Sequence, residues 1–262
     1  MIQTITPIDN TIYVEREYNA KIIEETILNS AIAQNKWGLL KVNERVDLLK
    51  KFVADFLSKE KQIIEEITRQ MGRPISQALN ELKGFKERAD HMLSIADDKL
   101  QDIYLPEKEN FKNYIKRIPM GISFVIAPWN YPYLTSVNSI IPSLAAGNSV
   151  ILKHSAQTPL CAEQLYESAK KTLPKNIFNY LHLNHNDSLK IVSDKRIGFV
   201  SFTGSVNAGY EVQKATMNKF ISIALELGGK DPAYVRHDAN LENTVENLVD
   251  GSFFNSGQSC CG

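Results

Sequence analysis

Residues 122–155 read ISFVIAPWNYPYLTSVNSIIPSLAAGNSVILKHS, and this stretch decides the fold. The apolar run at 123–128 predicts a buried strand, and the three- and four-residue spacing of apolar side chains at 135–147 predicts a helix. The apolar run at 148–155 predicts a second strand. A strand, a helix and a strand in this order form a parallel pair joined by a right-handed crossover.

The same alternation continues toward the end of the chain. Further strands are predicted at 176–183, 197–205 and 220–229, and further helices at 161–173, 186–194 and 208–218. Strands that alternate with helices of this length indicate an α/β fold. We expect a variant Rossmann-like parallel sheet flanked by helices.

The N-terminal part of the chain has a different pattern. Residues 20–99 carry apolar side chains at helical spacing, interrupted at Gly72 and Pro74. At 101–118 aromatic and β-branched residues replace this pattern, which predicts strands and turns.

Composition excludes several classes of function. The 262 residues include 30 basic and 30 acidic side chains, so the formal net charge is zero, which argues against a nucleic-acid partner. The chain has no apolar run of the length that spans a membrane, and its first residues lack the basic and apolar regions of a signal peptide. We therefore expect a cytoplasmic protein without a membrane partner.

Cysteines and histidines give no sign of a disulfide framework or a metal. Three cysteines, Cys161, Cys260 and Cys261, are an odd and low count for paired thiols. Cys161 lies on a predicted helix and is expected in the core. His182 and His185 have no cysteine or carboxylate partners at metal-ligand spacing, so we interpret both as surface or core residues and predict no metal site.

Five short segments follow one another in a recognisable order. They are APWNYP (127–132), VILKHSAQTP (150–159), SFTGSV (201–206), LELGGK (225–230) and GQSCCG (257–262). In this order they resemble the aldehyde dehydrogenase family, and the likeness covers nearly the whole chain. The resemblance implies NAD(P)-dependent oxidation of a small-molecule aldehyde to a carboxylic acid.

The resemblance also implies three catalytic residues. Cys260 matches the family's nucleophile, and a thiolate can attack an aldehyde carbonyl once its pKa falls toward neutrality. Asn130 matches the oxyanion residue, whose amide would act with the backbone N–H of Cys260. Glu226 matches the general base, and a partly apolar setting could raise its pKa so that it activates water.

Each of these residues has a structural alternative. Cys260 could be a small buried apolar residue, as lone cysteines usually are. Asn130 lies between Pro128 and Pro132 and could cap a turn. Glu226 could be a surface residue at a strand end. The surrounding motifs favour the catalytic interpretation in all three cases.

Cofactor residues are likewise implied by the resemblance, because the chain has no G-x-G-x-x-G fingerprint. Gly204 and Ser205 follow a predicted strand and open a helix, where free N–H groups can face a pyrophosphate. Lys153 matches the lysine at the adenosine ribose and Trp129 the tryptophan beside the nicotinamide. The remaining predicted cofactor contacts are Ala127, Ala156 and Leu227.

The identity of residue 156 bears on the choice between NAD and NADP. NAD-preferring relatives often carry a glutamate there, which binds the ribose hydroxyls. Ala156 removes a negative charge that would repel a 2′-phosphate, so we expect NADP to be tolerated, with Lys153 and His154 nearby. Tyr131 and Tyr133, on either side of Pro132, suggest an aromatic entrance for the aldehyde.

The resemblance divides the chain into parts. Residues 1–228 are expected to form the dinucleotide-binding domain, interrupted by an oligomerisation hairpin at 101–118. Residues 229–262 are expected to begin a catalytic domain, to start a helix within 251–262, and to expose apolar faces around Phe253 and Phe254. Members of the family continue for about as many residues again, and a terminal carboxylate at Gly262 would raise the pKa of Cys260.

These considerations leave three hypotheses. The chain is part of a working homo-oligomeric aldehyde oxidoreductase, a non-catalytic dinucleotide-binding fragment or remnant, or a CoA-acylating relative. Glu226 argues against the third, because transfer to CoA needs no base that activates water. We expect NAD(P)H formation by the isolated 262-residue chain to be absent or very weak.

Overall fold

A computed structural model describes residues 1–106 and 109–261 and confirms the α/β class. The strands are β1 (Ile2–Ile5), β2 (Ile12–Arg16), β3 (Ile103–Tyr104), β4 (Tyr114–Ile115), β5 (Ile122–Ala127), β6 (Ser149–His154), β7 (Phe178–Tyr180), β8 (Ile197–Gly204) and β9 (Ser222–Leu227). The helices are η1 (Ala20–Ile22), α1 (Ile23–Trp37), α2 (Val42–Leu57), α3 (Glu60–Met71), α4 (Ile75–Lys99), α5 (Pro132–Ala145), α6 (Pro159–Thr172), α7 (His185–Ser193), α8 (Val206–Ala215) and α9 (Leu241–Gly257).

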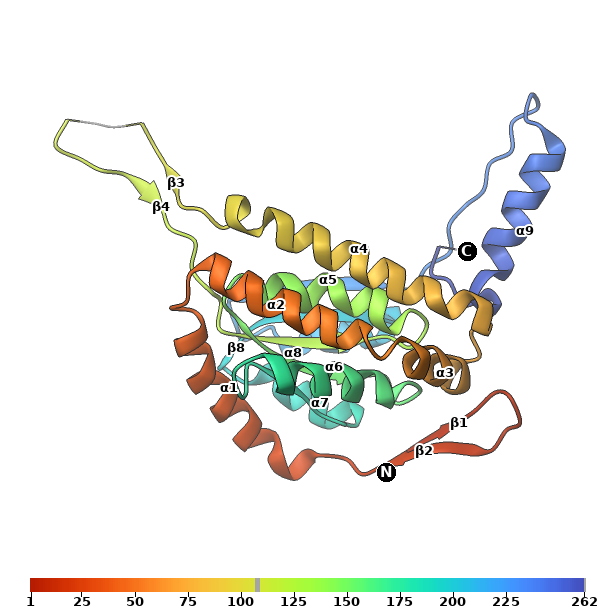
Figure 1. Cartoon of the computed structure of the whole chain (residues 1–262), viewed down its shortest axis with the longest axis horizontal. Helices are drawn as coiled ribbons and strands as arrows, with labels where there is room; N and C mark the ends of the chain where they lie inside the picture. Colours follow the sequence, from red (N-terminus) through yellow and green to blue (C-terminus); the bar gives the residue numbers. More distant parts are fainter. Residues whose placement is uncertain (107–108, 262) are drawn as a thin grey trace.

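A five-stranded parallel sheet lies at the centre, in the order β7-β6-β5-β8-β9 (Figure 1). Successive side chains of β5 point to opposite faces, so Val125 packs with α2, α5 and α6 while Phe124 packs with α1, α7 and α8. Helices α3 and α4 add to the first of these layers. Burial on both faces explains why β5 reads as an uninterrupted apolar run.

The predicted elements are confirmed with shifted ends. Helix α5 begins at Pro132, three residues before the predicted range, because proline suits the first turn of a helix. Helix α7 begins after Asn184, whose side chain accepts a hydrogen bond from the backbone N–H of Asp187. The edge strand β7 keeps three residues of the predicted eight because it pairs only with β6.

Two predictions at the ends of the chain need correction. Strands β1 and β2 form an antiparallel hairpin that was not predicted. The segment expected to start a helix within 251–262 instead ends one, since α9 begins at Leu241 and finishes at Gly257. Asn240 caps this helix by accepting from the N–H of Asn243, and Phe254, Asn255 and Ser256 leave helical geometry at its end.

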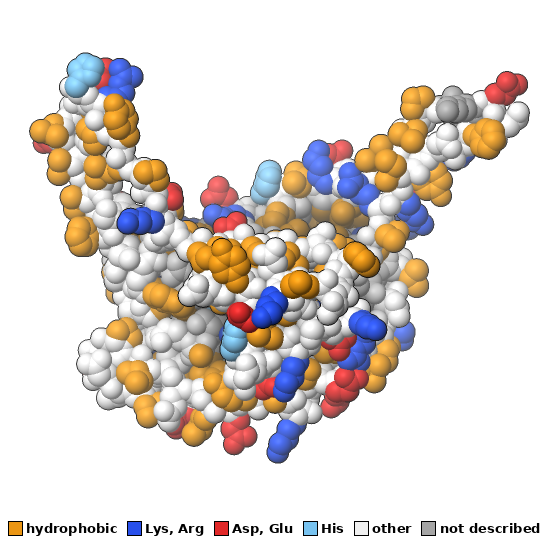
Figure 2. Space-filling model, turned by 180° about the vertical axis from the view of Figure 1, so that it is seen from behind, with side chains coloured by type: hydrophobic (Ala, Val, Ile, Leu, Met, Phe, Trp, Pro, Cys, Tyr) orange, Lys and Arg blue, Asp and Glu red, His pale blue; other side chains and the backbone are white. Residues whose placement is uncertain are grey.

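Two segments project from the body of the molecule. The β3–β4 hairpin lies at one end of α4, and α9 lies at the other (Figure 1). Both carry exposed apolar side chains (Figure 2). On α9 these include Leu241, Val245, Val249 and Phe253, and Phe253 is 73% exposed, as expected, whereas Phe254 is half-buried.

Within the described part of the chain, no helix combines the length and apolar character needed to cross a membrane.

Candidate active site

The carboxyl ends of the parallel strands meet at one edge of the sheet, and the predicted site residues gather there. Strand β5 leads into Trp129 and Asn130, β6 ends beside Lys153, β8 ends at Gly204, and β9 ends beside Glu226. In the register of the central strands Ala127 pairs with His154 and Thr203 with Glu226. In open α/β sheets this edge is where ligands bind.

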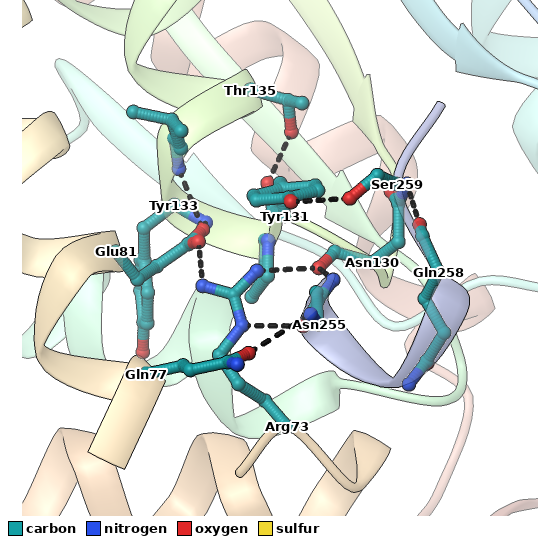
Figure 3. Close-up of polar contacts among 12 residues, drawn as sticks. Arg73, Gln77, Glu81, Asn130, Tyr131, Tyr133, Thr135, Asn255, Gln258 and Ser259 are labelled. Atoms are coloured by element: carbon teal, nitrogen blue, oxygen red, sulfur yellow. Dashed lines mark hydrogen bonds and ion pairs between the residues drawn. The ribbon is translucent and has the colours of Figure 1, made fainter. Parts of the chain in front are cut away.

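Asn130 contacts the segment that carries Cys260. Its side-chain Nδ2 donates to the carbonyl oxygen of Gln258 at 2.8 Å, and the hydroxyls of Tyr131 and Ser259 lie 2.6 Å apart (Figure 3). An amide nitrogen carries two N–H donors, so one donor of Asn130 remains for a second acceptor. The amide of Asn130 therefore bonds to a residue, Gln258, that precedes Cys260 by two positions.

The thiol of Cys260 is solvent-exposed and lies near the end of β9. The backbone of Cys260 packs against Gly229, and the Glu226 carboxylate is near enough for its charge to act on the sulfur. Partial burial raises the pKa of the Cys260 thiol, and Cys261 and Glu226 raise it further. The fall in pKa that nucleophilic attack requires is therefore absent from this arrangement of protein groups alone. The expected effect of Gly262 lies outside the described residues.

Glu226 is exposed on β9. The chain turns beyond it, where Gly228 and Gly229 have φ values of +65° and +143°. In this structure the turn brings the chain against Cys260.

Lys153 is a candidate cation for binding a ligand. Its side chain is half-buried at the end of β6, and burial lowers its pKa. No carboxylate within residues 1–106 or 109–261 forms an ion pair with it. A half-buried ammonium group without a carboxylate partner suits a phosphate or ribose ligand.

Gly204 and Ser205 join β8 to α8, as predicted. The hydroxyl of Ser205 caps α8 by accepting from the N–H of Ala208 at 3.3 Å. A hollow of about 460 Å³ opens beside this helix end, bounded by both α7 and α8. Its lining residues are His185, Ser205, Asn207, Ala208, Tyr210 and Glu211.

The other predicted cofactor residues differ in exposure. Trp129 is 41% exposed, Ala127 is buried, and Ala156 is exposed in the loop after β6. Leu227 packs against Gly209 of α8, where a Cβ would approach the leucine side chain to 2.5 Å. Leu227 thus packs β9 against α8, and it pairs with Gly204 at the end of β8.

Two residues expected near the site lie in the core instead. Tyr133 is fully buried beside Phe56 and Phe85, so of the two tyrosines Tyr131 alone stays a candidate for the predicted aromatic entrance. His154 is 2% exposed, and both ring nitrogens bond within the protein, to Pro132 and to the Ser155 backbone. Burial lowers the pKa of His154 to about 4, so it is a neutral core residue and offers no charge to a 2′-phosphate.

Three further predictions concern cysteine and histidine side chains. Cys161 is buried on α6, as predicted, and burial raises the pKa of its thiol. His182 packs in the core with Nε2 2.9 Å from Oε1 of Glu163, and His185 opens α7. Across the described residues no cluster of three side chains could hold a metal ion.

Sequence reasoning missed a buried ion pair under the site. Arg73 and Glu81 are 1% and 0% exposed at the side chain and bond to each other. Asn255, also buried, joins them through a 2.6 Å hydrogen bond from Arg73. A signal was available, because Glu81 interrupts the apolar stripe that runs through Ala78, Leu82 and Phe85 of α4.

Comparisons with known proteins identify the family to which the chain belongs. The aldehyde dehydrogenase family model matches residues 1–262. Betaine aldehyde dehydrogenase of Sinorhizobium fredii (strain NBRC 101917 / NGR234) is 31% identical over 241 residues, which cover 91% of this chain and 49% of that protein. D-glyceraldehyde dehydrogenase (NADP(+)) of Picrophilus torridus is 29% identical, with the same coverage.

Solved structures of relatives have the same fold. The crystal structure of PnpE in complex with nicotinamide adenine dinucleotide has a TM-score of 0.93 and 27% sequence identity. The match covers 99% of this chain and 54% of that one. The chain thus spans about half the length of the relatives it matches. Because the family model extends over every residue, the chain belongs to the aldehyde dehydrogenase family.

Proposed function

We propose that this chain supplies the nucleophile, the oxyanion donor and the general base for NAD(P)-dependent oxidation of an aldehyde to a carboxylic acid. One observation carries the proposal: the amide of Asn130 bonds to Gln258, and the segment beyond it holds Cys260 against the end of the strand bearing Glu226. Three groups of complementary chemistry therefore share one edge of the sheet. Structural roles for the same residues would not require this convergence.

The chemistry of each group fits a step of the reaction. The Cys260 thiolate attacks the carbonyl carbon, and the carbonyl π electrons move to the oxygen as the carbon–sulfur bond forms. The free N–H of Asn130 and the backbone N–H of Cys260 stabilise that oxyanion. A bound nicotinamide supplies the hydride acceptor. Glu226 then takes a proton from water, which attacks the thioester carbon and releases the acid and the thiolate.

The residues at the neighbouring strand ends fit a dinucleotide. Lys153 offers a cation, and the start of α8 at Ser205 offers helix N–H groups to a phosphate. The hollow beside α7 and α8 has room for an aromatic base against Ala208 and Tyr210. The exposed Ala156 brings no negative charge, so both NAD and NADP are proposed as ligands.

The β3–β4 hairpin and α9 bear on two questions: whether the chain alone is a non-catalytic dinucleotide-binding fragment, and how subunits assemble. We propose residues 1–228 as the cofactor-binding domain and 229–262 as the start of a catalytic one. The apolar face of α9 is exposed, and we propose that full activity requires further protein to cover it. Without that cover, the chain would act as a dinucleotide-binding fragment. The β3–β4 hairpin is proposed as a contact between subunits of a homo-oligomer, in the cytoplasm, where the free thiols stay reduced.

Thiol labelling tests the proposed nucleophile without requiring turnover. In a Cys261→Ser background the buried Cys161 is shielded, so iodoacetamide labelling followed by peptide mass spectrometry reports on Cys260. Propanal should slow this labelling by forming a thiohemiacetal, and Cys260→Ser should abolish it. NADPH fluorescence on titration should rise on binding, and Lys153→Met should weaken that binding. Labelling of Cys260 that propanal leaves unchanged would refute the assignment.

A further inference from the structure

The buried Arg73–Glu81 ion pair joins three parts of the chain beside the candidate site. The guanidinium of Arg73 donates to three different elements: to the Glu81 carboxylate on α4, to Oδ1 of Asn255 at 2.6 Å, and to the backbone carbonyl of Asn130 at 3.1 Å (Figure 3). It also lies over the ring of Tyr131, 4.5 Å from the centroid. A planar guanidinium with several fixed donors suits such a junction better than an ammonium group does.

Glu81 fixes the junction to the body of the protein. Its Oε1 accepts hydrogen bonds from the backbone N–H groups of Tyr133 at 2.9 Å and Leu134 at 2.8 Å. These groups open α5 and lack partners within the helix. Burial raises the pKa of the Glu81 carboxyl, while Arg73 and the two N–H groups oppose that rise. The junction is therefore anchored to a helix packed on the central sheet.

Asn255 connects the junction to the segment that carries Cys260. Its φ of 55° lies in the left-handed region, which asparagine tolerates better than most residues, and Ser256 follows at 57°. Its backbone N–H donates to Oε1 of Gln77, and its side-chain Nδ2 donates to the carbonyl of Asn130 at 3.0 Å. This turn directs residues 258–260 back toward Asn130.

The carbonyl of Asn130 consequently accepts two hydrogen bonds, from Arg73 and from Asn255, while its own side-chain amide donates to Gln258. Asn130 is thus fixed at two points: its backbone carbonyl bonds to Arg73 and Asn255, and its side-chain amide bonds to Gln258. Loss of the hydrogen bond from Arg73 or from Asn255 would let this peptide unit rotate and carry the amide away from the segment that bears Cys260.

We propose that Arg73 and Asn255 are positioning residues that fix the amide of Asn130 relative to the Cys260 thiol, and so determine how well an aldehyde adduct on that thiol is stabilised. This inference rests on the proposed function. Neither residue touches the aldehyde. Their effect should appear in the stability of the adduct and not in the chemical reactivity of the free thiol.

Asn255→Asp in the Cys261→Ser background tests this separation. Aspartate tolerates the left-handed turn and can still accept from Arg73, but it cannot donate to Asn130. Without aldehyde, iodoacetamide should label Cys260 at a rate within about twofold of the parent, whereas the propanal concentration that halves labelling should rise about tenfold. Ser256→Gly is the matched control, since it keeps the adjacent left-handed turn and loses only a contact to Gly72; it should behave as the parent.

Arg73→Lys provides an independent variant and a conservative one. Lysine keeps the positive charge against Glu81 but cannot reach all three acceptors, so propanal should protect Cys260 less well. The double variant Arg73→Met/Glu81→Leu removes both charges together and is the reference for stability. The melting temperature of Arg73→Lys should stay near that of this double variant. Circular dichroism establishes whether each variant is folded. If Asn255→Asp does not fold, Arg73→Lys alone tests whether the two residues position Asn130. Parent-like protection in the folded variants overturns the inference. If propanal fails to protect the parent, the proposed function itself is wrong.

Discussion

Gly229 lies directly against the backbone of Cys260. A Cβ built on Gly229 would come within 1.9 Å of the Cys260 carbonyl oxygen and 2.8 Å of its Cα. Gly229 also has a φ of +143°, which side-chain-bearing residues rarely adopt. The glycine therefore permits the approach of two segments that are 31 residues apart in the chain.

Gly229→Ala should separate these segments without unfolding the protein. Most side chains beyond Gly229 are exposed, and the buried Asn255 lies 26 residues further along, so the melting temperature should change by only a few degrees. Propanal protection of Cys260 should be lost because the carbonyl of Cys260 must move away. Gly251→Ala is the control: a Cβ there meets nothing within 4 Å, and alanine on α9 should leave protection unchanged.

Asn130→Ala should weaken the aldehyde adduct directly. Removal of one oxyanion donor typically costs about 2.7–4 kcal/mol, a factor of about 10² to 10³. The propanal concentration that halves labelling of Cys260 should therefore rise by at least about tenfold, since the adduct experiences only part of the transition-state charge. Asn138→Ala, at an exposed position on α5, should have no effect. Equal protection in both variants would reduce Asn130 to a turn residue.

Ala156→Glu should shift the choice of cofactor. The side chain is exposed in the loop after β6, so a carboxylate there would repel a 2′-phosphate but could accept hydrogen bonds from the ribose hydroxyls, and NAD binding should hold or strengthen. Fluorescence titration with NADH and NADPH should show NADPH affinity falling about tenfold. Gln101→Glu introduces the same charge near the β3–β4 hairpin and should change neither affinity. Binding of NAD to the parent at least about tenfold more tightly than NADP would contradict the role given to Ala156.

The parallel sheet could be predicted because its strands are buried on both faces, which produces apolar runs of strand length separated by helical spacing. The ends of the strands could not be predicted in the same way. Strand β7 pairs with β6 over three residues only, and the residues on either side of it in the sequence carry similar side chains. The N-terminal hairpin was not predicted because each strand is short and buries one apolar side chain, Ile2 in β1 and Val14 in β2. Its turn, with Pro7, Asp9 and Asn10, was the available signal.

The candidate site divides in the same way. Residues that project from strand ends, such as Lys153 and Glu226, follow from the motifs and the parallel topology. Arg73 and Asn255 do not, because their importance depends on a contact between residues 182 positions apart and on a left-handed turn at the end of α9. His154 was misjudged because its neighbour Lys153 faces the site, and adjacent residues of a strand face opposite sides.

The buried His154 makes a specific contribution to the pH dependence of stability. Its pKa is about 4 in the folded protein against 6.5 in the unfolded chain, so the unfolded state binds more protons between these values. Stability should therefore fall as the pH drops from about 6.5 to 4, by about 3 kcal/mol in total from this group. His154→Gln keeps a donor for the Pro132 carbonyl and cannot titrate, so its melting temperature should fall less steeply over this range. His91→Gln, which replaces an exposed histidine on α4, should keep the parent's pH profile. If His154→Gln and the parent lose stability in parallel between pH 6.5 and 4, other groups control the acid response.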